Sequence, residues 1–262
     1  MNKGILLFAF NNEKIDYVKQ AKFVATRAKQ YLNLPTTLVT DSPVEDEVFD
    51  NVRIAVDNHP TNNKTYRDRT TSTVLNFKNR ARMYAYDLSP YDNTILLDTD
   101  IVICNDQYNK VFQQTDDLLM YSNAYDITGN RNKNEFTYVS DIGCKFYWAT
   151  CVYFKKTKRT NIFFDLLKHI SQNYSYYKVL YELPTNVYRN DYAFSIAVHI
   201  MNNFSTKAIG EFPGTLYYST DKDSIINFNN NDILFLSENN KPIKTKGMNV
   251  HCMNKFNLES IL

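Results

Sequence analysis

Two carboxylates lie inside an apolar run at residues 93–103, and this feature constrains the fold more than any other in the chain. The run reads NTILLDTDIVI and contains Asp98 and Asp100. Consecutive apolar, strand-favouring residues predict a β-strand buried on both faces, as in a parallel sheet covered by helices. Ionised carboxylates beside such a strand cost free energy unless a cation or hydrogen bonds compensate their charge. A polar ligand is therefore expected here.

Asp98 and Asp100 are predicted to share that ligand. In extended backbone, residues i and i+2 point to the same side, so the two carboxylates are expected to converge on one point. Carboxylate oxygens in this arrangement suit a hard divalent cation, such as Mn²⁺ or Mg²⁺, which can also carry the phosphates of a substrate. The alternative is a pair of solvated carboxylates in a turn.

The first half of the chain alternates between strand and helix patterns. Apolar runs predict strands at residues 5–10, 36–40 and 52–56, and helical spacing predicts helices at 15–32 and 73–88. The carboxylate-bearing run follows the second helix. This order predicts an α/β, Rossmann-like fold with a mostly parallel sheet flanked by helices.

Polar residues follow three of the predicted strands, namely Asn11, Asp41 and the pair at Asp98 and Asp100. Ligands of parallel sheets bind at the carboxyl ends of strands. These positions together predict a nucleotide-binding site. Asn11 and Asp41 could equally serve as turn residues.

The second half is less regular. Its pattern predicts a polar loop at residues 123–140, a strand at 147–154, and helices at 161–170 and 190–201. No repeat or linker interrupts it. The chain has 262 residues, of which 44% are hydrophobic and 22% charged, so residues 1–262 are expected to form one globular domain. Residues 1–105 would be its nucleotide-binding half and residues 106–262 its acceptor-side half.

The charge balance disfavours a protein dedicated to coating nucleic acid. The net charge is only +2, whereas such proteins are usually more basic. A local basic face remains open between residues 64 and 82, and its alternative is a solvated helix face. The cations of this stretch are Lys64, Arg67, Arg69, Lys78, Arg80 and Arg82.

The four cysteines show no spacing typical of a zinc site, which predicts buried free thiols in a reducing compartment. The short apolar start lacks the length and cleavage site of a secretory signal. No stretch approaches the roughly 20 apolar residues of a membrane span. We expect a cytoplasmic protein, in the host cytoplasm if it comes from a phage; its oligomeric state stays open.

The segment Leu96-Leu97-Asp98-Thr99-Asp100 resembles the DxD motif of glycosyltransferases with the GT-A fold. It follows a predicted basic helix that ends in Leu88-Ser89-Pro90-Tyr91-Asp92, similar to the family-8-like members of the glycogenin and galactosyltransferase type. The resemblance extends over residues 4–255 and is specific around 78–103. It implies a nucleoside-diphosphate sugar as donor, with uridine as the expected nucleoside, and Mn²⁺ or Mg²⁺ held by Asp98 and Asp100 on the diphosphate.

The same resemblance implies further donor-site residues. His251 would complete the metal site, and Lys255 would meet the diphosphate, although the usual Gly and Pro-Trp pattern after the histidine is missing. A basic residue of the helix before the motif would contact the donor sugar or diphosphate. Lys78 and Arg82 are four residues apart and are expected to share a helix face, so both are assigned to the donor. Asn11 and Asp41 would contact the base or ribose.

Asp191 is the candidate for the reaction centre, because the resemblance places an acidic or amide residue here near the sugar. It opens a predicted helix, where a carboxylate also serves as a cap, and capping is its alternative role. Asp141, after the polar loop, is a second candidate as catalytic base. Family-8 enzymes retain the anomeric configuration, whereas an inverting enzyme needs a carboxylate base. The sequence leaves both outcomes open.

The acceptor has two predicted classes. Residues 189–194 and the Asn-rich composition are similar to glycosyltransferases of tailed bacteriophages, some of which modify hydroxymethylated bases in their own DNA. A DNA acceptor, either such a base or a sugar already on it, could use the basic stretch and the tyrosines of residues 174–181 for stacking. The other class is a cell-surface glycan or a protein. Either reading makes the protein a hexosyl- or pentosyltransferase.

Two other functions remain as alternatives. A nucleotidyltransferase also uses paired carboxylates and a divalent ion, but usually has a Gly-rich loop after its first strand, and none follows Phe10 here. The second alternative is a non-catalytic module that binds a sugar or a nucleotide.

Overall fold

A seven-stranded sheet forms the centre of the protein. The computed structural model describes residues 2–56, 62–69, 71–129 and 137–262. The strand order of the sheet is β11-β8-β10-β6-β1-β2-β3, and every neighbouring pair is parallel except those of β10, which runs antiparallel to β6 and β8. The mostly parallel sheet predicted from the sequence is therefore confirmed. Its strands are β1 (Lys3–Phe8), β2 (Thr36–Thr40), β3 (Asn51–Ile54), β6 (Asn93–Leu97), β8 (Leu118–Tyr121), β10 (Trp148–Lys155) and β11 (Gly210–Glu211).

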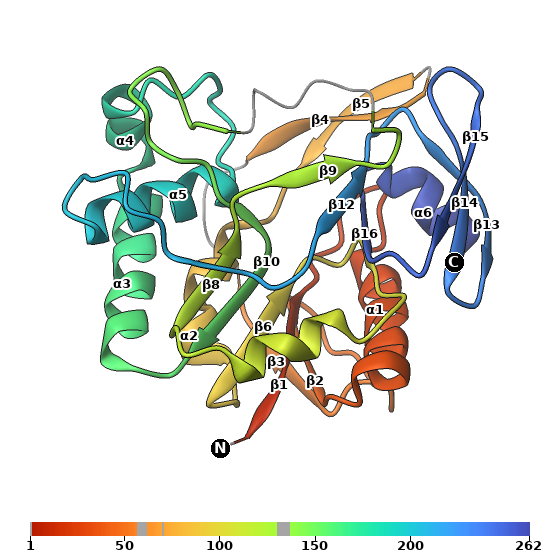
Figure 1. Ribbon diagram of the computed structural model, residues 1–262, viewed down its shortest axis with the longest axis horizontal. Coiled ribbons are helices and arrows are strands. Elements are labelled where there is room, and N and C mark those ends of the chain that lie inside the picture. The colour runs from red at the N-terminus through yellow and green to blue at the C-terminus, as the bar shows by residue number, and fades with distance from the viewer. Residues whose placement is uncertain (1, 57–61, 70, 130–136) are drawn as a thin grey trace.

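Helices cover the sheet from two sides, as Figure 1 shows. α1 packs on β1 and β2. α5 packs on β10, and α3 packs against α5. The predicted helices near residues 15–32, 161–170 and 190–201 are confirmed. The helices are α1 (Tyr17–Leu32), α2 (Ala85–Leu88), α3 (Lys158–Gln172), α4 (Tyr174–Leu180), α5 (Asn190–Met201) and α6 (Lys255–Ile261), with the 3₁₀ turns η1 (Arg80–Tyr84) and η2 (Gln107–Gln113).

Local capping explains where the two long helices begin. The side chain of Asp16 accepts a hydrogen bond from the backbone N–H of Lys19 and caps α1. Thr157 and Thr160 satisfy each other's backbone N–H groups in a capping box at the start of α3. Each cap supplies an acceptor to N–H groups that the helix itself cannot satisfy.

The chain leaves the central sheet at Asp98. β6 ends at Leu97, residues 98–100 form a turn, and β7 (Ile101–Val102) continues into a second sheet of order β7-β16-β12-β9. The extended geometry predicted for the two carboxylates is therefore wrong, because a turn separates the strands. In the second sheet β16 (Val250–Cys252) pairs antiparallel with β7. The other strands of this sheet are β9 (Ala124–Asp126) and β12 (Leu216–Ser219).

The helix predicted at residues 73–88 is wrong over its first half. Residues up to Asn76 form the hairpin of β4 (Asn63–Asp68) and β5 (Thr71–Asn76). Only η1 and α2 are helical. Leu75 packs with Tyr66 in a small cluster under the hairpin, and this cross-strand packing overrides the helical spacing. The polar tail also forms a sheet, from β13 (Ser224–Asn229), β14 (Asp232–Leu236) and β15 (Pro242–Lys246).

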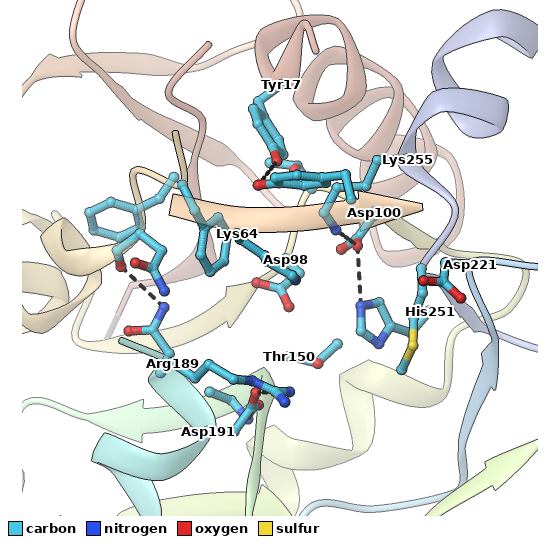
Figure 2. A pocket seen from close by; sticks show the side chains of 18 of the residues that line it. Tyr17, Lys64, Asp98, Asp100, Thr150, Arg189, Asp191, Asp221, His251 and Lys255 are labelled. Carbon is cyan, nitrogen blue, oxygen red and sulfur yellow. Dashed lines mark hydrogen bonds and ion pairs between the residues drawn. The ribbon is translucent and has the colours of Figure 1, made fainter. Parts of the chain in front are cut away.

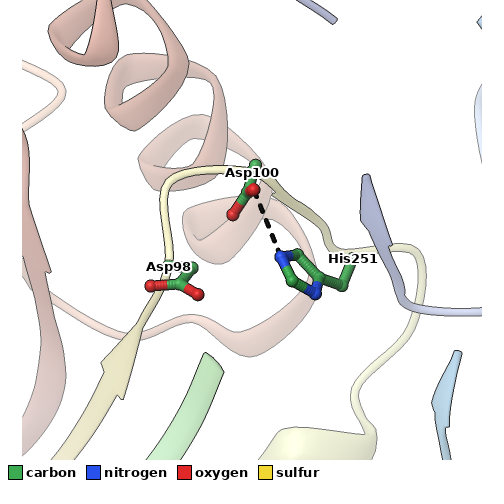
Figure 3. A group of neighbouring side chains, drawn as sticks. All are labelled: Asp98, Asp100 and His251. Atoms are coloured by element: carbon green, nitrogen blue, oxygen red, sulfur yellow. Dashed lines mark hydrogen bonds and ion pairs between the residues drawn. The ribbon is translucent and has the colours of Figure 1, made fainter. Parts of the chain in front are cut away.

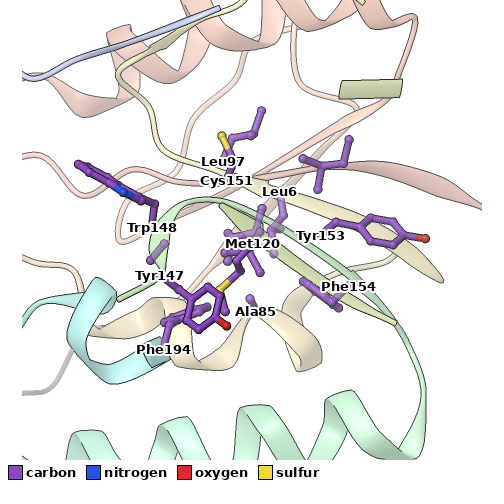
Figure 4. Close-up of a cluster of buried hydrophobic side chains, with 14 of the residues drawn as sticks. Leu6, Ala85, Leu97, Met120, Tyr147, Trp148, Cys151, Tyr153, Phe154 and Phe194 are labelled. Carbon is purple, nitrogen blue, oxygen red and sulfur yellow. The ribbon is translucent and has the colours of Figure 1, made fainter. Parts of the chain in front are cut away.

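The core lies between the sheet and its helices, and Figure 4 shows part of it around Leu97, Cys151 and Phe194. All four cysteines are buried and free, which confirms the predicted thiols. The polar loop predicted at 123–140 contains β9, and its residues 130–136 lie outside the described part of the chain. Among the described residues, no helix is long and apolar enough to cross a membrane.

Candidate functional site

A pocket of about 470 Å³ opens where β6 ends. Its walls come from β1, the β4–β5 hairpin, the segment before η1, the start of β10, the start of α5, and the adjoining β12, β16 and α6. Figure 2 shows charged side chains from several of these elements turned into the same space. This is the carboxyl edge of the parallel strands, where α/β folds bind ligands.

Asp98, Asp100 and His251 form a three-residue group in this pocket. One ligand atom from each side chain lies within 4.8 Å of the others, and Nε2 of His251 is 3.2 Å from Oδ2 of Asp100. Figure 3 shows the two aspartates on the turn after β6 and the histidine on the neighbouring strand. The pairing of β16 with β7 explains the approach, because it aligns His251 with Ile101, next to Asp100. Carboxylate oxygens and an imidazole nitrogen are a ligand set that fits Mn²⁺ or Mg²⁺.

Two cations compensate the carboxylates, of which Asp100 is buried and Asp98 is half-buried. Nη1 of Arg82 contacts Oδ1 of Asp98, and Nζ of Lys255 contacts Oδ2 of Asp100. Burial disfavours the charged form of Asp100, but Lys255 and His251 outweigh it and hold the pKa of Asp100 below its usual range. Burial raises the pKa of Asp98, an effect that Arg82 opposes and the charge of Asp100 reinforces. One carboxylate of the pair is thus firmly ionised without any metal.

Lys78 and Arg82 both line the pocket, but they do not share a helix face as predicted. Lys78 precedes η1, and its Nζ lies 2.8 Å from Oδ2 of Asp41. The guanidinium of Arg82 is almost fully buried and also donates to the carbonyl of Ala149 at 2.7 Å. Because a hairpin replaces the first half of the predicted helix, the two cations pair with different carboxylates, Lys78 with Asp41 and Arg82 with Asp98.

Two predicted donor residues are not in the pocket lining. Asn11 accepts a hydrogen bond from the backbone N–H of Val18 at 3.0 Å and donates to Asp16 at 2.9 Å, so it serves the start of α1. Asp41 forms an ion pair with Lys78, which orients the lysine. The structure therefore brings Lys78, but not these two side chains, to the site.

Asp191 lies in the pocket wall in the first turn of α5. Its Oδ1 accepts a hydrogen bond from the backbone N–H of Ala149 at 3.0 Å, and its Oδ2 pairs with Arg189 at 2.9 Å. Asp191 makes no capping hydrogen bond at the start of α5, although it lies in the first turn, where the helix dipole favours a carboxylate. Asp141, by contrast, lies on an exposed turn and is not among the residues that line the pocket.

Several residues of the lining, including Lys64, Arg189 and Asp221, were not predicted from the sequence as donor-site residues. Lys64 lies on β4, and burial, together with the charges of Lys255 and Arg189, lowers its pKa to about 8. Arg189 stands two residues before Asp191, a spacing that does not predict an ion pair, because residues two apart do not face each other on a helix. Lys64 carried no local signal either, because its place depends on a hairpin that the periodicity did not predict.

Comparisons with known proteins give matches among solved structures alone. No protein-family model matches the chain, and no curated protein sequence matches it. An active-site mutant of LgtC is similar with a TM-score of 0.48 and 13% identity, over 83% of this chain and 72% of that chain. The glycosyltransferase GlyE of Streptococcus pneumoniae TIGR4 is similar with a TM-score of 0.43 and 12% identity, over 84% of this chain.

A third similar structure is the galactosyltransferase LgtC in complex with donor and acceptor sugar analogs. Its TM-score is 0.45, with 13% identity over 74% of this chain and 70% of that chain. The matched part of GlyE is 45% of its length, so this chain corresponds to less than half of that protein.

Proposed function

We propose that this protein is a metal-dependent glycosyltransferase that moves a hexose or pentose from a nucleoside-diphosphate sugar to an acceptor hydroxyl. One observation carries the proposal: Asp98, Asp100 and His251 converge at the carboxyl edge of the central sheet, inside a pocket rich in cations. The DxD resemblance of the same aspartates supports a family-8-like enzyme and a uridine nucleotide.

Asp98, Asp100 and His251 would hold Mn²⁺ or Mg²⁺. The ion would neutralise the negative charge that builds on the departing diphosphate. Arg82 and Lys255, which already contact the two carboxylates, are positioned to share that diphosphate, and Lys78 lines the same pocket. Arg82 and Lys255 would thus compensate the charge of the metal ligands and also that of the leaving diphosphate.

Asp191 is the residue that we assign to the sugar. Glycosyl transfer passes through a transition state with positive charge on the anomeric centre. The N–H of Ala149 and the guanidinium of Arg189 each engage one oxygen of Asp191, which fixes the carboxylate in the pocket wall. A fixed negative charge there stabilises the developing positive charge. The exposed Asp141 is less suited to this role.

The acceptor that we favour is a hydroxyl of a glycan or protein. The two features that a DNA acceptor could use, the basic stretch and the tyrosines of residues 174–181, are largely engaged inside the molecule. Arg82 is buried and Arg80 donates to the carbonyl of Ser171 at 3.0 Å, so the basic stretch is not a continuous surface. Tyr174, Tyr177 and Tyr181 are buried as well. Binding to duplex DNA that is tight at low salt and falls steeply with added salt would restore the DNA acceptor.

The proposal is tested by following the breakdown of a panel of nucleotide sugars, with Mn²⁺, Mg²⁺ or a chelator. A glycosyltransferase releases a nucleoside diphosphate when it transfers the sugar. The release is slow when water takes the sugar and faster when an acceptor does. A nucleotidyltransferase instead releases pyrophosphate when it is given a nucleoside triphosphate and a sugar phosphate. A thermal-shift measurement on the same panel identifies the donor, because a bound ligand stabilises the folded state. No binding and no metal-dependent release across the panel would contradict the proposal.

A further inference from the structure

Four cations of the pocket lining are already paired with carboxylates of the chain. These pairs are Lys78 with Asp41, Arg82 with Asp98, Arg189 with Asp191, and Lys255 with Asp100. Each cation has its charge compensated before any ligand arrives.

Lys64 differs from these four. Its Nζ lies 4.7 Å from the centre of the Phe77 ring and 5.4 Å from that of Tyr66. With the described residues it forms neither an ion pair nor a hydrogen bond. Aromatic faces compensate an ammonium only in part. Arg67 on the same strand is also without an anionic partner in the described chain, but it is exposed, so water compensates it.

Lys64 lies between the proposed metal site at Asp100 and the Arg189–Asp191 pair. The charges that act on its ammonium are those of Lys255 and Asp100 on one side and of Arg189 and Asp191 on the other. Figure 2 shows Lys64 entering from the hairpin and the Arg189–Asp191 pair entering from another wall. A donor whose diphosphate is bound at the aspartates and whose sugar reaches Asp191 would pass this ammonium.

The hairpin that carries Lys64 is tied down at several points. The hydroxyl of Tyr66 lies 2.9 Å from that of Tyr17, at the start of α1. The Tyr66 ring packs edge-on against Phe256, with ring centres 6.4 Å apart. Asn254 donates a hydrogen bond of 2.9 Å to Asp68 at the end of β4. The backbone of Lys64 is therefore held over the pocket by contacts with α1 and with the residues that begin α6.

We propose that Lys64 binds the diphosphate of the donor, as the contribution of the β4–β5 hairpin to the leaving-group site. This inference rests on the proposed function. Lys64 is half-buried, its ammonium is repelled by two neighbouring cations, and no carboxylate of the described residues pairs with it, so an incoming anion supplies its missing partner. In the transition state the same contact stabilises the charge that the diphosphate gains when its bond to the sugar breaks.

Three variants test this inference. Lys64→Met keeps the length of the side chain and removes the charge, Lys64→Arg keeps the charge, and Lys246→Met changes an exposed lysine outside the pocket as the matched control. The probe is the nucleoside diphosphate that the wild-type protein binds most tightly among UDP, GDP, ADP and dTDP with Mn²⁺. Calorimetry gives its Kd, and a titration with Mn²⁺ alone checks the metal site.

We expect Lys64→Met to raise the Kd of the nucleoside diphosphate by about 10- to 100-fold, the loss of one hydrogen bond to a charged group. Its affinity for Mn²⁺ alone should not fall and its melting temperature should not decrease, which would separate lost binding from lost folding. Lys64→Arg should stay within about threefold of the wild type, because guanidinium also pairs with phosphate, and Lys246→Met should be unchanged.

Two outcomes would overturn the inference, and they differ from a failure of the proposed function. If Lys64→Met binds the nucleoside diphosphate as the wild type does, or if Lys64→Arg is as weak as Lys64→Met, the ammonium is not a ligand of the diphosphate, although the enzyme assignment stands. If the wild-type protein binds none of the four nucleoside diphosphates with Mn²⁺, the proposed function and the role of Lys64 fail together.

Discussion

The ammonium of Lys255 contacts the same carboxylate oxygen of Asp100 that Nε2 of His251 approaches at 3.2 Å. In the protein without metal, a lysine thus supplies positive charge at the group that we propose as the metal site. Lys255 lies at the start of α6 and His251 on β16, so a short stretch of chain brings both to one aspartate. A divalent ion would have to compete with this lysine for Asp100.

Lys255→Met is therefore expected to have opposite effects on two ligands. Removing the ammonium frees Asp100 and lowers the positive charge beside it, so Mn²⁺ alone should bind about 3- to 10-fold more tightly. The nucleoside diphosphate should bind about tenfold more weakly, because it loses a cation. Titrations of Mn²⁺, without and then with the nucleotide, measure both. A loss of affinity for Mn²⁺ alone would show that Lys255 supports the metal site instead of competing for it.

Arg82→Met should destabilise the fold. It leaves Asp98 and the carbonyl of Ala149 without their cation and donor. Because the Asp98 side chain is still 30% exposed, we expect the free energy of unfolding to fall by about 2–3 kcal/mol. This is below the cost of breaking a fully buried pair. Lys168→Met is the control, since its pairs with Asp87 and Asp165 are at the surface and should be worth less than about 1 kcal/mol. Urea unfolding in the presence of a chelator compares them; equal losses would contradict the assigned burial.

Asp191→Asn should separate catalysis from binding. The amide oxygen can still accept the hydrogen bond from Ala149, but the ion pair with Arg189 is lost, so the protein should lose some stability while it stays folded and the Kd of the nucleoside diphosphate changes little. Without the fixed charge, kcat should fall about 100-fold. Asp141→Asn provides the contrast, because this residue is exposed and is not part of the lining. A loss of kcat in Asp141→Asn, with Asp191→Asn fully active, would transfer the catalytic role to Asp141.

Lys64 should make stability depend on pH in the metal-free protein. Its pKa is lowered to about 8 from the ordinary 10.5, so between these values the unfolded chain binds a proton that the folded protein does not. The free energy of unfolding should therefore rise with pH across this window, and the penalty should be complete below pH 8.

Lys64→Gln removes this titration. The variant should be more stable than the wild type at pH 7, by about 1–3 kcal/mol, and the difference should shrink toward zero as the pH rises to 10.5. Parallel unfolding curves of the two proteins at several pH values isolate this residue from the other groups that titrate there. A constant difference across the window would rule out the assigned pKa.

The α/β fold was predictable because each element of the first sheet carries its own pattern. Leu96 and Leu97 continue an apolar run that is buried on both faces, and the spacing of Val18, Ala21 and Ala25 marks the buried face of α1. Such local signals need no knowledge of distant contacts. The hairpin at Lys64 has none: Leu75 becomes a strand residue because it packs with Tyr66 across the turn.

The same distinction applies to the site. Asp98 and Asp100 could be predicted from the sequence as site residues, because charge within an apolar run is unusual. Their convergence was predicted from the wrong geometry, since a turn rather than a strand brings them together. The approach of His251 depends on the pairing of β16 with β7, across about 150 residues of chain. Only the family resemblance suggested it, and no local pattern could.

Asp100 is the residue that we propose binds the metal on which donor breakdown depends. The most direct measurement is the rate of nucleoside diphosphate release from the best-binding nucleotide sugar, with Mn²⁺, for the wild type and Asp100→Asn. We expect the release to depend on Mn²⁺ and to fall at least 100-fold in the variant, while the variant keeps a cooperative unfolding transition. Release that is unaffected by a chelator, or equal in the two proteins, would contradict the account.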